Sequence, residues 1–153
     1  MLHYKRFQKH EEGRWIVLLH GTGGNSEVWY RQVSAFSQHF NLLLIDLVGH
    51  GESSVLQILH KQFNFESVAE QVMEVVDHLG IERAHFMGLS LGSIVVRVLA
   101  ELHPERIESM VLAGAVTEPN RESRIIVPDA GHLCNVDNRS FFNRVSLNFL
   151  RTF

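Results

Sequence analysis

The chain has one cysteine, and it has no apolar run of the length that a membrane helix requires. Cys134 has no second cysteine to pair with, so no disulfide forms within the chain, which is consistent with a reducing compartment. A membrane-spanning helix needs about 20 consecutive apolar residues, and residues 1–14 carry charges where a secretory signal needs an apolar core. We therefore expect a cytoplasmic protein without a membrane segment.

The chain also lacks an excess of charge of either sign. Its 14 lysines and arginines face 17 aspartates and glutamates, for a formal net charge of −3, which gives no electrostatic reason to expect nucleic acid or an anionic membrane as a partner. The 10 histidines are scattered without the spacing of metal ligands, so we expect neither a metal nor another cofactor. With 45% hydrophobic residues, the 153 residues suffice for one domain with a single core.

Apolar segments near residues 15–19, 42–46, 84–88 and 110–114 predict strands. Their apolar character is nearly continuous, which is typical of a parallel sheet covered on both faces. Helical spacing follows Ser26, continues from residue 91 to before Pro104, and returns over residues 139–150. A further helix follows Ser67, which would form a capping box with Glu70. The pattern predicts an α/β fold with a mostly parallel sheet and helices on both faces.

The segment 85–93 runs from an apolar strand into Gly88-Leu89-Ser90-Leu91-Gly92 and then into a helical pattern. In this setting Gly-x-Ser-x-Gly is typical of a nucleophile elbow, a tight turn that holds a serine hydroxyl out of the sheet while its glycines admit neighbouring backbone. The turn also points the backbone N–H of Leu91 toward an oxyanion formed when Ser90 attacks a carbonyl. Ser90 is therefore the candidate nucleophile, and Leu91 N–H is a candidate oxyanion donor.

Two further segments stand where this chemistry needs them. The strand at 15–19 ends in a glycine-rich loop at 20–24, where Thr22 N–H is the second candidate oxyanion donor. Residues 124–132 predict a short strand that delivers His132 at its carboxyl end as the candidate general base. Because open α/β sheets bind ligands at the carboxyl ends of their strands, we expect Ser90, Thr22 and His132 to meet there.

With these motifs, the chain resembles the α/β-hydrolase family in its small esterase, lactonase and C–C hydrolase members. The resemblance rests on the loop at 20–24, a D-x-x-G-H-G-x-S turn at 46–53, the elbow, and a histidine loop at 129–132. It covers residues 1–117 and 123–153 of the single domain 1–153. Family members insert a helical cap, a strand ending in the triad acid, and a helix between these two parts. Here only residues 117–123 stand between them, which implies a truncated core without a cap.

No motif of the chain assigns the acid that would orient His132. Our candidate is Glu118, which follows the strand after the nucleophile helix, a position that some members of the family use. Asp129 is too close to His132 in sequence to reach the far ring nitrogen, Asp137 resembles the N-cap of the last helix, and Asp46 resembles a structural turn residue. Without an acid the ring tautomer is not fixed, and the rate falls by about 10⁴-fold.

The short connection also bears on the fold, because two parallel strands normally need a crossover of about a dozen residues or more. Residues 115–123 are too few for the usual helix. We expect the final strand and helix either to dock with an apolar patch left exposed or to exchange between two chains in a swapped homodimer. A third interpretation is that the chain is a fragment, a splice form or an engineered deletion.

The sequence therefore predicts a serine hydrolase with a small-molecule ester or lactone as substrate, and the resemblance favours enol-lactones. A first alternative is a catalytically impaired α/β-hydrolase remnant that serves as a binding or assembly module. A second is acyl transfer or C–C bond hydrolysis with the same serine. Cys134, two residues after His132, is interpreted as a small apolar filler of the histidine loop rather than as a nucleophile.

Overall fold

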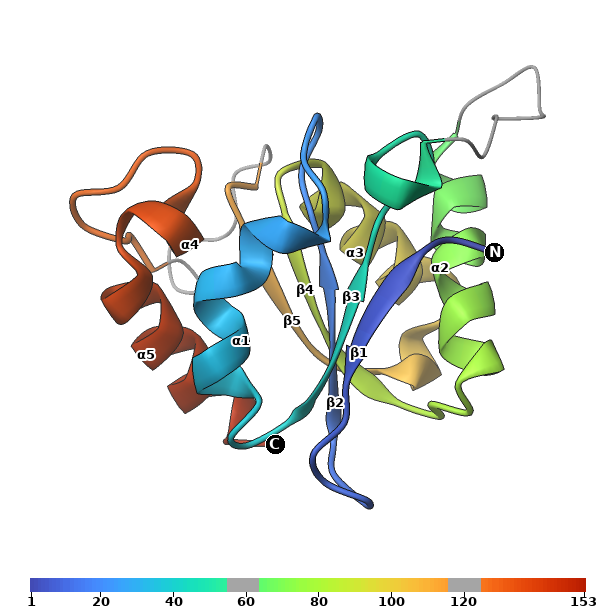
Figure 1. Cartoon of the computed structure of the whole chain (residues 1–153), viewed down its shortest axis with the longest axis horizontal. Helices are drawn as coiled ribbons and strands as arrows, with labels where there is room; N and C mark the ends of the chain where they lie inside the picture. Colours follow the sequence, from blue (N-terminus) through green and yellow to red (C-terminus); the bar gives the residue numbers. More distant parts are fainter. Residues whose placement is uncertain (55–63, 116–124) are drawn as a thin grey trace.

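The computed structural model describes residues 1–54, 64–115 and 125–153. Its sheet has five strands in the order β1-β3-β2-β4-β5 (Figure 1). They are β1 (Tyr4–Phe7), β2 (Trp15–Leu19), β3 (Asn41–Ile45), β4 (Ala84–Leu89) and β5 (Ile107–Ala113). Strands β2 to β5 are parallel, and β1 pairs antiparallel with β3. The four predicted strands are confirmed within a few residues. The sequence prediction has no counterpart to β1, whose apolar pattern is interrupted by Lys5 and Arg6.

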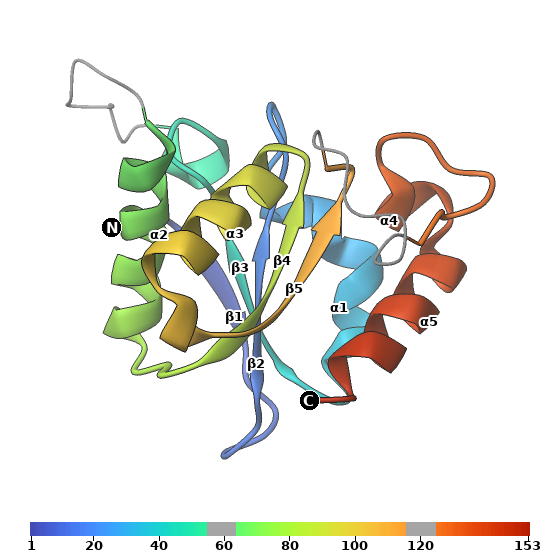
Figure 2. The same ribbon diagram turned by 180° about the vertical axis from the view of Figure 1, so that it is seen from behind.

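Helices cover both faces of this sheet, as predicted. Helices α2 and α3 lie on one face, and α1 and α5 lie on the other (Figures 1 and 2). No helix in the described part of the chain is long and apolar enough to cross a bilayer. The helices are η1 (Ser26–Trp29), α1 (Tyr30–Phe36), η2 (Gly51–Ser53), α2 (Phe65–His78), α3 (Leu91–Leu102), η3 (Pro104–Arg106), α4 (Cys134–Asp137) and α5 (Arg139–Leu150).

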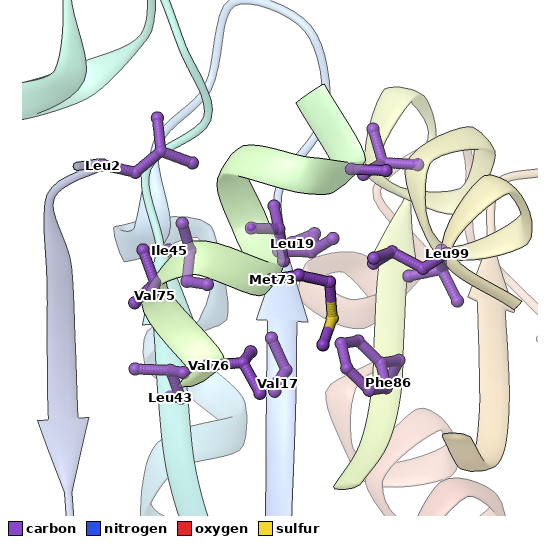
Figure 3. Packing of buried hydrophobic residues seen from close by; sticks show 14 of the residues in the cluster. Leu2, Val17, Leu19, Leu43, Ile45, Met73, Val75, Val76, Phe86 and Leu99 are labelled. Atoms are coloured by element: carbon purple, nitrogen blue, oxygen red, sulfur yellow. The ribbon is translucent and has the colours of Figure 1, made fainter. Parts of the chain in front are cut away.

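The core consists of two apolar layers, one on each side of the sheet. On the first side, Figure 3 shows Met73 and Val76 of α2 and Leu99 of α3 against the central strands. On the second side, Trp29 and Phe142 pack in one buried cluster with β2, β3 and β4. Each such side chain stabilises the fold by about 1.5–3 kcal/mol on burial. The central strands are therefore fixed from both sides, and so are the loops at their carboxyl ends.

Two predicted helix caps are wrong. Helix α2 begins at Phe65, and the Asn64 side chain caps it by accepting a 2.7 Å hydrogen bond from Ser67 N–H. Glu70 closes no capping box with Ser67, because its carboxylate pairs with His103 at 3.0 Å. Helix α5 is capped by Asn138, which accepts from Phe141 N–H, and not by Asp137. In both helices the N-cap is an asparagine, whereas the sequence pattern predicted a nearby residue, Ser67 or Asp137, as the N-cap.

The predicted last strand is also wrong, since residues 125–127 form no strand. The short connection does not bring them into the sheet, and Ile125 and Ile126 remain 60% and 70% exposed. The C-terminal part docks instead on α1, where Gln32 Nε2 donates 2.8 Å hydrogen bonds to Asn135 O and to Asn143 Oδ1. Within one chain, the C-terminal part thus docks with an apolar patch left exposed, and its exchange between two chains stays a prediction. Strand β5 is left at the edge of the sheet.

The exposed isoleucines beside an open strand edge lead to a prediction about self-association. Unpaired strand edges and exposed apolar patches are recognition surfaces, so we expect the chain to associate as its concentration rises, through exchange of its C-terminal part. The substitution Ile126→Lys should weaken this association, and Gln38→Lys in the exposed turn after α1 serves as its surface control. Light scattering coupled to size-exclusion chromatography measures the change, and a monomer at every concentration would contradict the expectation.

Candidate active site

Ser90 lies on the turn between β4 and α3, in the strained conformation φ 51°, ψ −112°. Two glycines make this turn sterically accessible. A Cβ on Gly88 would lie 2.3 Å from Gly92 O, and a Cβ on Gly92 would lie 2.2 Å from Leu19 O. Ser90 N–H donates a 2.8 Å hydrogen bond to Ala113 O, which fixes the turn to the end of β5. The tight strand-to-helix turn predicted from the motif is present, and strain of this kind costs about 1–3 kcal/mol.

The loop after β2 lies directly beside Ser90. A Cβ on Gly21 would lie 3.1 Å from Ser90 Cβ and 3.8 Å from its Oγ, so only a glycine fits without displacement. Thr22 follows on the exposed side of this loop. Leu91 is the first residue of α3, where backbone N–H groups have no acceptor within the helix. The two candidate oxyanion donors thus stand on the two segments that flank Ser90.

His20 fixes the shape of the same loop. Leu47 N–H donates to its Nε2 at 3.0 Å, so the ring proton is on Nδ1, which donates to Gly21 O at 2.7 Å. Burial lowers the pKa of His20 despite the opposing effect of the Gly21 carbonyl, and the nearby His50 lowers it further. The neutral ring therefore bridges the loop and the segment after β3. His20 therefore has a structural role in this loop.

Asp46 organises the neighbouring turn rather than the chemistry. Its carboxylate accepts hydrogen bonds from Ser26 N–H at 2.6 Å and Glu52 N–H at 3.0 Å, and His3 Nδ1 lies 3.1 Å away. Burial acts to raise the pKa of Asp46, but the Ser26 and Glu52 hydrogen bonds outweigh it and hold the pKa below its ordinary value. The interpretation of Asp46 as a structural turn residue is confirmed.

The lowered pKa of Asp46 predicts how stability depends on pH. A carboxyl group with a lower pKa in the folded chain stabilises the fold above its ordinary pKa of 3.8, and this stabilisation is lost as the pH falls through the folded-state pKa. Asp46→Asn should cost about 2 kcal/mol at pH 7, because the charged acceptor of two backbone N–H groups is lost. Urea unfolding of both proteins at pH 7 and pH 3 tests this. An equal difference at the two pH values would contradict it.

His132 reaches the same end of the sheet from the C-terminal part of the chain. Its ring lies against Gly114, where a Cβ would come within 3.1 Å of Cε1 and 3.3 Å of Nδ1. Gly114 directly follows Ala113, the acceptor of the Ser90 N–H hydrogen bond. The loop is held by Asp137, whose carboxylate accepts from Gly131 N–H at 2.9 Å. Ser90 and His132 therefore stand at the carboxyl ends of two adjacent strands.

The hydrogen bonds of a complete triad are not formed among residues 1–54, 64–115 and 125–153. Within these ranges Ser90 Oγ makes no hydrogen bond to the exposed His132 ring, and no carboxylate pairs with that ring. Glu118, the candidate acid, lies outside the described residues. Asp77 pairs with Arg106 at 2.7 Å, and Asp137 braces the loop.

Gly21 and Gly114 are not among the predicted site residues, yet each lies against one of the candidate catalytic side chains. The signal available in the sequence was a glycine within two residues of the end of an apolar strand, Gly21 after β2 and Gly114 after β5. Concerning metals, the described residues contain no group of three or more His, Cys, Asp or Glu side chains that could hold an ion. The arrangement thus offers a strained serine, nearby backbone N–H groups and a neighbouring imidazole.

Comparison with known proteins places this geometry in context. The family model for the alpha/beta hydrolase fold matches residues 14–138. RutD of Pseudomonas savastanoi pv. phaseolicola, named as a carbamate hydrolase, is 33% identical over 123 residues, which cover 80% of this chain and 47% of RutD. The chain spans about half the length of the curated relatives it matches.

Two solved structures bear on the fold. The enol-lactonase from Burkholderia xenovorans LB400 matches with a TM-score of 0.68 at 36% identity, over 74% of this chain and 43% of that one. A CIB-like hydrolase from Thermoplasma acidophilum matches with a TM-score of 0.86 at 18% identity, over 98% of this chain and 92% of that one. The second likeness concerns the fold alone. It means that nearly the whole arrangement, the C-terminal part included, also occurs in a protein of similar length.

Proposed function

Since the chain belongs to the α/β-hydrolase fold family, we propose that it is a serine hydrolase that cleaves carboxylic esters or lactones. The observation that carries the proposal is Ser90, held in a strained conformation between two glycines whose neighbours exclude any side chain. Such strain is costly and persists at functional sites, where it presents a reactive group. The names of relatives agree, since they include a pimeloyl-[acyl-carrier protein] methyl ester esterase from Aeromonas hydrophila and the enol-lactonase.

In this proposal Ser90 Oγ attacks the substrate carbonyl carbon while His132 takes the hydroxyl proton. The N–H groups of Thr22 and Leu91 donate hydrogen bonds to the oxyanion. The intermediate then expels the alcohol, which receives the proton from His132. Water enters by the reverse of these steps, releases the acid and restores Ser90. Glu118 is the proposed acid that would hold the His132 ring, and a cytoplasmic location, consistent with the lone Cys134, belongs to the same proposal.

The specificity follows from the short connection after β5. A family site without its cap is open, so we expect turnover of small activated esters with little selectivity for the acyl group. Among lactones, enol-lactones are the proposed class, supported by the name of the Burkholderia structure. Acyl transfer and C–C bond hydrolysis use the same serine, and they differ from ester hydrolysis in the acceptor or leaving group.

A second candidate function is a catalytically impaired remnant that serves as a binding or assembly module. The observation that favours it is the absence, within the described residues, of a hydrogen bond between Ser90 Oγ and the His132 ring. Hydrogen bonds of catalytic groups are often long or unformed without substrate, so this absence is compatible with both functions and does not rule out catalysis. The module and the enzyme differ in whether Ser90 is activated.

Fluorophosphonate labelling separates the two functions, because the reagent reacts only with an activated serine. We expect intact-mass analysis to find one label per chain and peptide mapping to place it on Ser90. His132→Ala should reduce the labelling rate, whereas His39→Ala in the exposed turn after α1 should not. A folded protein that takes no label would overturn the enzymatic proposal in favour of the module.

A further inference from the structure

A groove runs along the outer edge of β5, on the side away from β4. It has a volume of about 230 Å³, and its walls are residues 110–114 and the α5 residues Phe142, Val145 and Phe149. Successive side chains of a strand point to opposite faces of the sheet. A cavity that touches five consecutive residues must therefore run along the edge of the strand, where β5 has no further neighbour in the described sheet (Figure 2).

One end of the groove, at Gly114, lies beside the candidate general base His132. Gly114 lines the groove, and the His132 ring lies against that same residue, within 3.1 Å of where a Cβ would be. On the other side of β5, Ala113 O accepts the hydrogen bond from Ser90 N–H at 2.8 Å. When the carbonyl group of a substrate lies at Ser90, the groove therefore begins beyond His132, on the same side of the substrate as the His132 ring.

The chemistry of ester cleavage decides which part of the substrate lies on that side. His132 gives its proton to the departing oxygen, so the alcohol part must be next to His132 and the acyl part must be away from it. We infer that the groove along β5 binds the alcohol part of an ester substrate, as an extended neutral arm that carries an amide group. This inference rests on the proposed function and specifies its substrate class.

The walls of the groove select an arm of this kind. The open edge of β5 offers backbone N–H and C=O groups, which bind an amide as a neighbouring strand would, while the α5 wall is apolar apart from Ser146. Among the described residues, no Asp, Glu, Lys, Arg or His side chain lines the groove, which favours a neutral arm. At about 3.3 Å per residue, the four steps from Met110 to Gly114 give a length of about 13 Å.

Two series of substrates test the orientation. In acetate esters from ethyl to pentyl, kcat/KM should rise roughly fourfold for each methylene of the alcohol. In p-nitrophenyl esters with acyl chains of the same lengths, it should stay nearly flat. The preference for an amide is tested with 2-acetamidoethyl acetate, whose alcohol part has the length of that of pentyl acetate. Its kcat/KM should be higher than that of pentyl acetate. Equal slopes in the two series, or a preference for the pentyl ester, would overturn the inference.

Two tryptophan variants test whether the alcohol part binds in the groove itself. Val145→Trp fills the groove, whereas Asn148→Trp places the same side chain on the exposed face of α5. We expect Val145→Trp to lower kcat/KM for 2-acetamidoethyl acetate at least tenfold more than for methyl acetate, whose alcohol part is too short to reach the groove. Asn148→Trp should change neither. Circular dichroism and fluorophosphonate labelling verify that both variants fold, and equal losses in both would contradict the assignment.

Binding without turnover separates this inference from the proposed function. In Ser90→Ala protein, N-acetylethanolamine should shift the NMR amide signals of residues 110–114, and Val145→Trp should abolish these shifts. Shifts in a protein whose Ser90 takes no fluorophosphonate would support the groove and overturn the hydrolase. A labelled Ser90 without such shifts would support the hydrolase and overturn the groove.

Discussion

Replacing Ser90 by alanine is expected to lower kcat for ester hydrolysis by roughly 10⁴-fold or more, because the nucleophile is removed while the oxyanion donors remain. The free energy of unfolding should change by less than about 0.5 kcal/mol, since alanine retains the Cβ and Ser90 Oγ has no hydrogen bond in the described part of the chain. Initial rates with p-nitrophenyl acetate and urea unfolding midpoints measure the two quantities. Loss of activity at constant stability would assign the chemistry to the hydroxyl.

The matched control is Ser34→Ala, because Ser34 is an exposed serine on α1 at a distance in sequence from every candidate site residue. This variant should retain the wild-type rate and the wild-type unfolding midpoint. A Ser90→Ala protein that hydrolyses the ester at the wild-type rate would remove Ser90 from the mechanism. Equal losses in both variants would show that the loss is not specific to the Ser90 hydroxyl.

The elements that the sequence predicts well are those whose signal is local. Strands β2, β3 and β4 are buried on both faces, so their apolar runs are nearly continuous, and the Ser90 turn follows from five adjacent residues. Strand β1 is defined by its partner, because Tyr4 and Phe7 take their places only through pairing with Ile45 and Leu42 of β3. A short edge strand of this kind has no pattern of its own.

The positions of the helix caps and of the histidine loop depend on contacts between residues that are far apart in the sequence, so local sequence patterns do not predict them. Asn64 and Ser67 both fit an N-cap, and Asn64 serves because Phe65 packs against the core and adds a turn to α2. Residues 125–127 have the composition of a strand, yet no crossover brings them into the sheet. His132 arrives beside β5 because Gly114 leaves space for its ring. Its identity as a candidate came from the motif, whereas its position depends on that contact.

Gly92→Ala should be a strongly damaging single-methyl substitution at the site. The added Cβ would lie 2.2 Å from Leu19 O and 2.8 Å from His20 O, both backbone atoms of a buried strand end that has little room to move. Helix α3 would have to move away from β2, and the Leu91 N–H and Ser90 would move with it. We expect a loss of about 3 kcal/mol in the free energy of unfolding, at the upper end of overpacking costs, together with a loss of fluorophosphonate labelling.

Gly131→Ala provides the comparison, because its added Cβ would meet only Asp137 Oδ2, at an ordinary 3.4 Å. Its unfolding midpoint in urea should match the wild type, so the cost at Gly92 can be attributed to the contact with Leu19 rather than to the loss of a glycine as such. If Gly92→Ala unfolds at the wild-type urea concentration, the close approach of α3 to β2 is not required for the fold. If the Gly92→Ala protein also reacts with the fluorophosphonate at the wild-type rate, the position of Leu91 N–H does not depend on the close approach of α3 to β2. The proposed oxyanion site would then lose its structural basis.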